Sequence, residues 1–209
     1  MIVKVCGMRD PDNIRAIEAL GVDWMGFIFY RKSPRVAPDE APDYLPAACR
    51  KVGVFVNSSI EEIVSRVRGY SLDMVQLHGS ESPDFCRQLS RLLPGVDLIK
   101  AMQVRSAEDL TRASEYSGAV SWLLFDTPTA GFGGSGRNFD WSLLAGYEGE
   151  VPFILSGGIG PDSVEAISSL RHPAFAGVDL NSRFETAPGL KDVDAVRAFI
   201  ESLKEKIQS

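Results

Sequence analysis

Residues 153–162 read Phe-Ile-Leu-Ser-Gly-Gly-Ile-Gly-Pro-Asp, and this stretch contains a complete strand-to-helix turn. Phe153–Leu155 is a short apolar run, typical of a strand that is buried on both faces. Gly157 and Gly158 follow as a turn, and Gly160-Pro161-Asp162 has the composition of a helix start, because proline and acidic residues suit the first helical turn. The stretch therefore predicts one β/α unit.

The same unit recurs along the chain. Eight short apolar runs are the expected strands: Ile2–Cys6, Trp24–Phe29, Val52–Val56, Met74–Leu77, Leu98–Ala101, Trp122–Phe125, Phe153–Leu155 and Phe175–Leu180. Segments with apolar residues at helical spacing lie between them: Pro11–Leu20, Ile60–Tyr70, Ser82–Leu93, Ser106–Tyr116, Pro161–Leu170 and Val193–Ile207. The strands recur about every 20 to 28 residues, which leaves room for a crossover helix and therefore implies parallel pairing.

These units predict an α/β fold, with residues 1–209 forming a single (β/α)₈-barrel domain. The chain of 209 residues is compact for this fold, so a doubly wound open sheet is the structural alternative. The short strands favour the barrel, and so does the lack of a dinucleotide fingerprint after the first strand. The weakest unit is Pro38–Cys49, where Pro42 and Pro46 would interrupt a helix.

A glycine-rich segment, Gly131–Gly136, matches the pattern G-x-G-x-x-G but lacks the context of a dinucleotide site. Thr127–Ala130 separates it from the preceding strand, and Arg137-Asn138-Phe139 follows it instead of a helix start. We therefore expect an active-site loop whose amides, including those of Gly134 and Gly136, can bind phosphate.

Composition and charge exclude several classes of function. The formal net charge is -6 and there is no basic stripe, which argues against a nucleic-acid partner. No apolar run is long enough to span a membrane, and the first residues do not resemble a signal peptide. Three scattered cysteines suit a reducing cytoplasm, and no His/Cys cluster has metal-ligand spacing. No feature points to an obligate protein partner.

Candidate catalytic residues lie at the carboxyl ends of the expected strands, where barrel enzymes carry their chemistry. Cys6 ends the first strand, and Asp126 directly follows the apolar run Trp122–Phe125. Arg35 could bind a carboxylate or a phosphate, and Gly157 and Gly158 could bring backbone amides close to an anion. Taken alone, His78 fits a core histidine slightly better than a ligand contact.

The ordered set of strand-end motifs resembles the phosphoribosylanthranilate isomerase family of tryptophan biosynthesis. It spans almost the whole chain, and the matching segments are Lys4–Arg9, Gly26–Phe29 with Ser33-Pro34-Arg35, Gly53–Asn57, Gln76-Leu77-His78-Gly79, Asp126 with Gly133–Gly136, Phe139-Asp140-Trp141 and Ser156–Ile159. Each motif is weak alone, but their order is specific.

The resemblance implies an isomerase that converts N-(5'-phosphoribosyl)anthranilate to 1-(2-carboxyphenylamino)-1-deoxyribulose 5-phosphate by an Amadori rearrangement. It implies Cys6 as general base, Asp126 as general acid and Arg35 as the contact to the anthranilate carboxylate. It also implies a set of substrate contacts that includes the glycines of the phosphate region: His78, Gly134, Gly136, Gly157, Gly158, Asn181 and Ser182. No cofactor is expected, because no electron or hydride leaves the substrate, and no metal is expected, because no His/Cys cluster has metal-ligand spacing. Arg183 departs from the family, which commonly has glycine at this position.

Three other functions stay open from the residues. A phosphoribosyl isomerase of histidine biosynthesis has an aspartate at the end of its first strand, where this chain has Cys6. A barrel aldolase or lyase would need a Schiff-base lysine, for which Lys100 is the obvious strand candidate. A non-catalytic phosphosugar-binding protein would keep the glycine turns but would not need Cys6 together with Asp126.

The alternation of side chains along the first expected strand gives a separate prediction for Lys4. Alternation places Lys4 and Cys6 on the same face, so a Cys6 side chain at the barrel mouth requires Lys4 inside the barrel. A buried ammonium needs a partner, and Asp126 and Asp179 are the nearest expected carboxylates. Such a charge would also favour the Cys6 thiolate.

Overall fold

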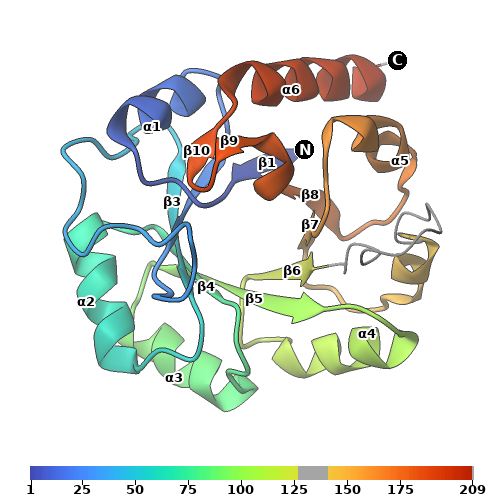
Figure 1. Ribbon diagram of the computed structural model, residues 1–209. Helices are drawn as coiled ribbons and strands as arrows, with labels where there is room; N and C mark the ends of the chain where they lie inside the picture. The colour runs from blue at the N-terminus through green and yellow to red at the C-terminus, as the bar shows by residue number, and fades with distance from the viewer. Residues whose placement is uncertain (127–140, 209) are drawn as a thin grey trace.

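The computed structural model describes residues 1–126 and 141–208, in which eight parallel strands close into a barrel in sequence order (Figure 1). The strands are β1 (Ile2–Val5), β2 (Trp24–Ile28), β3 (Arg50–Phe55), β4 (Met74–Leu77), β5 (Asp97–Gln103), β6 (Trp122–Asp126), β7 (Phe153–Ser156) and β8 (Phe175–Leu180). Strand β1 pairs with β8, with Lys4 opposite Asp179. This pairing closes the sheet, so the barrel prediction is confirmed and the open sheet is excluded.

Helices surround the strands (Figure 1). The α-helices are α1 (Pro11–Glu18), α2 (Ile60–Tyr70), α3 (Pro83–Leu92), α4 (Ala107–Ala113), α5 (Val164–Ser169) and α6 (Val193–Gln208). Short 3₁₀ turns add η1 (Ser114–Tyr116), η2 (Trp141–Gly146), η3 (Pro161–Ser163) and η4 (Ser182–Phe184). Four α-helices begin with a side-chain cap: the side chains of Asp10, Ser59, Ser82 and Asp192 accept from the backbone N–H groups of Asn13, Glu62, Phe85 and Ala195.

Besides small shifts at strand ends and the division of Ser106–Tyr116 into α4 and η1, the structure differs from the sequence-based expectation in three further places. Pro161–Leu170 divides into η3 and α5, and Pro38–Cys49 contains no helix or strand. The latter segment is held by side chains instead, because Glu18 Oε1 accepts from the amides of Ala47 and Ala48 at 2.6 and 2.5 Å. A hairpin of β9 (Glu185–Ala187) and β10 (Leu190–Lys191) follows β8 and was not expected.

Two apolar clusters show which side chains point into the barrel and which point out. The inner cluster contains Trp24, Val52, Met74, Ile99, Ala101, Leu124 and Ile154. The rings of Trp24 and Trp122 meet edge to face, with centroids 4.9 Å apart. A much larger cluster packs between strands and helices. Apolar side chains therefore fill the barrel, and the polar groups of the site lie above them at the carboxyl ends of the strands.

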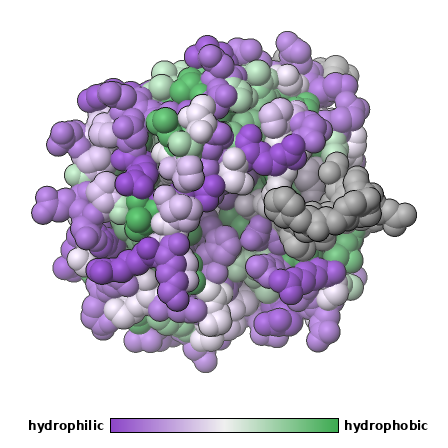
Figure 2. All heavy atoms as spheres, viewed as in Figure 1, coloured by the Kyte–Doolittle hydropathy of each residue, from purple (hydrophilic) through white to green (hydrophobic). Residues whose placement is uncertain are grey.

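The outer surface differs from this interior. Figure 2 shows that hydrophilic residues cover most of the face seen in Figure 1, with hydrophobic residues scattered between them. In the part of the chain that the structure describes, none of the helices combines the length and apolar character needed to cross a membrane.

Candidate active site

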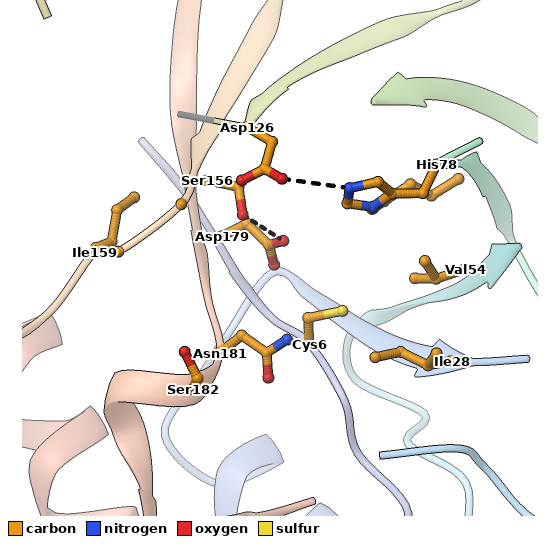
Figure 3. A pocket seen from close by; sticks show the side chains of 13 residues that line it. Cys6, Ile28, Val54, His78, Asp126, Ser156, Ile159, Asp179, Asn181 and Ser182 are labelled. Atoms are coloured by element: carbon orange, nitrogen blue, oxygen red, sulfur yellow. Dashed lines mark hydrogen bonds and ion pairs between the residues drawn. The ribbon is translucent and has the colours of Figure 1, made fainter. Parts of the chain in front are cut away.

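A pocket of about 210 Å³ opens at the carboxyl ends of the strands (Figure 3). Its wall comes from strand ends and loops that are far apart in the sequence. Its lining residues are Cys6, Ile28, Val54, Gln76, His78, Asp126, Ser156, Gly157, Gly158, Ile159, Asp179, Asn181 and Ser182. The barrel thus brings together seven of the predicted site residues: Cys6, His78, Asp126, Gly157, Gly158, Asn181 and Ser182. Gly134 and Gly136 lie outside the described residues.

Cys6 directly follows β1 and is 4% exposed. Its amide donates to the carbonyl of Leu180 at 2.9 Å, which fixes its backbone beside the end of β8. Gly26 on β2 makes room for the side chain, because a Cβ atom built there would lie 2.8 Å from Cys6 Sγ. The Cys6 thiol therefore reaches the pocket over a position that has no side chain.

Lys4 lies inside the barrel, fully buried, as alternation along β1 predicts. Its Nζ is 2.9 Å from Asp179 Oδ1, and its charge also acts on the neighbouring Cys6 side chain, whose pKa it lowers. Burial alone would lower the pKa of Lys4, but Asp179 and Cys6 together raise it above its usual value. The predicted carboxylate partner is confirmed, and of the two candidates it is Asp179.

The Cys6 thiol is surrounded by charges of both signs. Burial is the main effect and raises its pKa above the ordinary value. The neighbouring cations Lys4 and Lys191 oppose that rise, whereas Asp179 adds to it. The structure thus holds Cys6 mainly as a thiol whose thiolate, once formed, is a stronger base than an ordinary cysteine.

Asp126 ends β6, and His78 follows β4 on the neighbouring part of the wall. His78 Nε2 lies 3.5 Å from Asp126 Oδ2, and the two side chains are 32% and 27% exposed. The interpretation of His78 as a core histidine is therefore wrong, because its ring faces the pocket and a carboxylate. Figure 3 shows these two side chains facing each other, with Cys6 in a different part of the wall.

The glycine turn after β7 has the backbone that its sequence requires. Gly157 and Gly158 adopt φ angles of +90° and +65°, a region that favours glycine. Arg183 lies against this turn: its Nη1 donates to the carbonyl of Gly158 at 3.1 Å and pairs with Asp162 Oδ1 at 3.1 Å. The arginine at the usual glycine position thus supports the turn and adds a cation beside it.

Arg35 is held by an acidic residue that sequence reasoning missed. Its Nε is 2.9 Å from both carboxylate oxygens of Glu185, and its Nη2 is 2.7 Å from Oε2. Glu185 also accepts from Lys191 Nζ at 2.5 Å, and that ammonium donates to Asn181 Oδ1 at 2.8 Å. Burial would raise the pKa of Glu185, but the bonds from Arg35 and Lys191 lower it. Glu185 and Lys191 lie on the β9–β10 hairpin, which had no periodic signal in the sequence.

The contacts of Lys100 stabilise the fold. Its buried ammonium donates to the carbonyls of Leu77 and Gly79 at 3.1 and 2.7 Å and pairs with Glu81 Oε2 at 3.0 Å. These contacts tie β5 to the loop after β4, so the lysine is not presented as a free amine for Schiff-base chemistry.

Comparison with known proteins gives the same family along the whole chain. Residues 3–202 match the sequence profile of the family described as N-(5'phosphoribosyl)anthranilate (PRA) isomerase. An N-(5'-phosphoribosyl)anthranilate isomerase of Parabacteroides distasonis is 50% identical over 97% of this chain and 93% of its own length. The enzyme of that name from Phocaeicola vulgatus is 49% identical over the full length of both chains.

Solved structures agree with the sequence matches. The phosphoribosyl anthranilate isomerase of Thermotoga maritima superposes with a TM-score of 0.83, is 34% identical and covers 98% of this chain and 100% of its own. An isomerase crystallised with reduced 1-(o-carboxyphenylamino)-1-deoxyribulose 5-phosphate has a TM-score of 0.81, is 32% identical and covers the same shares.

Proposed function

Because the chain belongs to the N-(5'-phosphoribosyl)anthranilate isomerase family, we propose that Cys6 is the general base and Asp126 the general acid of its reaction. The enzyme converts N-(5'-phosphoribosyl)anthranilate to 1-(2-carboxyphenylamino)-1-deoxyribulose 5-phosphate in tryptophan biosynthesis. Each of the two residues acts by a proton transfer at a different atom of the substrate.

The rearrangement needs two proton transfers. Asp126 gives its proton to the ring oxygen of the ribose, and the bond from that oxygen to C1' breaks as the nitrogen lone pair forms an iminium. The Cys6 thiolate then takes the proton from C2', and the electrons of that C–H bond form the enolamine. The proton held by Cys6 then returns to C1', and the 2'-hydroxyl loses its proton to the Asp126 carboxylate as the C2' carbonyl forms. This step gives the ketose and restores both residues, so no net protons or electrons are gained or lost.

One observation carries this assignment. Cys6 and Asp126 enter the same pocket from different parts of its wall, which allows a sugar between them to meet an acid at one atom and a base at another. Lys4 supports the base, because a neighbouring ammonium lowers the pKa of the Cys6 thiol and so favours the thiolate. The histidine-pathway isomerase is not supported, since Cys6 stands where that enzyme carries an aspartate.

The substrate has anionic groups at both ends, and we assign the phosphate to the wall of the pocket and the carboxylate to Arg35, which is not one of the residues that line the pocket. The phosphate goes to the amides of Gly157 and Gly158 together with Asn181 and Ser182, with the loop that carries Gly134 and Gly136 as a further source of amides. The anthranilate carboxylate goes to Arg35, whose Nη1 takes no part in its bonds to Glu185.

We also propose that residues 1–209 act as one catalytic domain in the cytoplasm. The three cysteines are free thiols, which supports a reducing compartment. The phosphorylated substrate is the partner that the geometry of the described residues supports.

The test is turnover of phosphoribosylanthranilate, followed by loss of its fluorescence, in the variants Cys6→Ser and Asp126→Asn. Each should lower kcat by at least about 10²-fold without unfolding the protein, because acid–base catalysis commonly contributes that much. Cys86→Ser and Asp84→Asn on α3, away from the pocket, are matched controls that should keep normal turnover. Near-normal turnover of either site variant would remove that residue from its role.

A further inference from the structure

Gln76 on β4 is a buried polar residue of the pocket. The stability of the fold alone does not explain why a polar side chain lies there. The side chain is 1% exposed, yet it lines the pocket beside His78. Its Nε2 lies 3.0 Å from His78 Nδ1. Its Oε1 is a buried atom without a hydrogen-bond partner among the described residues. A buried amide with one end bonded to a pocket histidine and the other end open points to a role in the site.

The amide decides where His78 carries its proton. An amide NH₂ group can only donate, so His78 Nδ1 must accept and the proton of the neutral ring must lie on Nε2. Nε2 is the atom that faces Asp126 Oδ2 at 3.5 Å. Oδ2 is the carboxyl oxygen of Asp126 that lies near this N–H, so a proton on the protonated carboxyl is better placed on Oδ1.

We propose that Gln76 is a positioning residue that holds His78 in the Nε2–H tautomer and thereby directs the transferable proton of Asp126 to Oδ1. The inference rests on the proposed role of Asp126 and goes beyond it, because it names the residue that decides which carboxyl oxygen delivers the proton. The assignment rests on geometry alone. The three side chains that carry it are those of Gln76 on β4, His78 directly after β4, and Asp126 at the end of β6.

The carbonyl oxygen of the Gln76 amide keeps the Nε2–H tautomer of His78 in place during catalysis. Gln76 is a lining residue of the pocket and its Oε1 is a buried acceptor, so a hydroxyl of the bound sugar is the group that we expect to donate to it. A hydroxyl in that position would hold the amide with its oxygen toward the sugar and its NH₂ toward His78. Substrate binding and the histidine tautomer are thus linked through one side chain.

The test uses the small number of histidines in the chain, which are His78 and His172. His172 is an internal reference, since its Nδ1 accepts from the Ala174 amide at 3.1 Å and its Nε2 donates to the Tyr147 carbonyl at 2.8 Å. Two-bond ¹H–¹⁵N NMR spectra, recorded at about pH 8.5 where an ordinary histidine is neutral, should show both rings as Nε2–H tautomers. A proton on Nδ1 of His78 in the wild-type protein would overturn the proposal.

Two substitutions extend the test. Gln76→Glu keeps the size but replaces the donor by an acceptor, so the His78 signals should change to a ring protonated at Nδ1 while those of His172 stay in place. Gln76→Met should lower kcat at least tenfold and raise KM, because it removes both the donor and the acceptor. Gln88→Glu on the exposed face of α3 is the matched control and should change none of these readouts.

The outcomes separate this inference from the proposed function. Unchanged His78 signals in Gln76→Glu, or normal kcat in Gln76→Met, would show that Gln76 only fills space. Normal turnover of Asp126→Asn would instead remove the acid, and the NMR result on the tautomer would be unaffected by it.

Discussion

Gly26 lies directly against the side chain of Cys6, so that an added Cβ would sit 2.8 Å from Sγ and 3.1 Å from Cα of that residue. The contact crosses from β2 to the end of β1, and it includes backbone, which cannot rotate away. The position and orientation of the thiol thus depend on a glycine in the neighbouring strand.

Gly26→Ala is therefore expected to displace the thiol. We expect kcat/KM to fall at least tenfold, with a loss of about 1–3 kcal/mol in the free energy of unfolding from overpacking. Steady-state kinetics and urea titration measure the two effects. Gly69→Ala on α2, where an added Cβ meets nothing within 4 Å, is the control and should leave turnover unchanged. Full activity of Gly26→Ala would mean that the thiol position is not critical.

Arg35→Lys should raise KM by about tenfold or more, with a smaller change in kcat. The guanidinium can hold Glu185 with Nε and Nη2 and still offer Nη1 to a carboxylate, whereas an ammonium has no planar fork. Initial rates over a range of phosphoribosylanthranilate concentrations give both constants. Unchanged kinetics would show that Arg35 only joins its loop to the β9–β10 hairpin.

Glu185→Gln should destabilise the fold by about 3–5 kcal/mol at neutral pH, because Arg35 and the buried Lys191 would lose their common anion. The folded-state pKa of Glu185 is lowered, so its contribution to stability is present above the unfolded-state value and is lost as the pH falls through the folded-state value. Urea titrations should therefore show the difference from wild type shrinking as the pH drops below about 4. Glu201→Gln on the exposed face of α6 should show no such difference.

The strands show how much of this fold can be predicted from the sequence. Parallel strands that are covered on both faces have continuous apolar sequences. For this reason the predicted ranges Met74–Leu77 and Phe175–Leu180 agree with β4 and β8 at both ends. Strand β5 is longer than predicted because its ends, Asp97 and Gln103, are polar and carry no apolar signal.

The part of the site that was missed depends on contacts between distant segments. Strands β9 and β10 have three and two residues, too few for a periodic pattern. Glu185 is 150 residues away from Arg35, and only closure of the barrel brings them together. His78 was misinterpreted for a related reason. The end of β4 was predicted correctly, but whether the ring of the next residue faces the core or the mouth depends on the course of the loop after the strand, which periodicity does not define.

The ionisation of Cys6 itself can be followed with pH. Burial raises the pKa of the thiol, so its thiolate is a minor species at neutral pH and becomes more populated as the pH rises. The rate of Cys6 alkylation by iodoacetamide should therefore keep increasing with pH through about 9 instead of reaching a plateau near the ordinary cysteine value of about 8.5. A plateau of the alkylation rate at or below that value would exclude a raised pKa of the thiol.

Lys4 and Asp179 act on the same thiol in opposite directions, which makes a sharper test. Lys4 lowers the pKa of Cys6 and Asp179 raises it. Lys4→Met should therefore move the pH profile of Cys6 alkylation by iodoacetamide to higher pH and slow the reaction several-fold at a fixed pH. Peptide-resolved mass spectrometry separates Cys6 from Cys49 and Cys86, whose pKa values burial raises to about 12 and about 11.

The single substitution also leaves Asp179 buried without its cation, which is expected to cost about 3–5 kcal/mol of stability. The double variant Lys4→Met with Asp179→Asn removes both charges and should recover part of that stability. Because the two charges have opposite effects on the thiol, the alkylation profile of the double variant should lie closer to wild type than that of Lys4→Met. If the profile of Lys4→Met coincides with wild type while the protein remains folded, then Lys4 serves only to pair with Asp179 and does not tune the base.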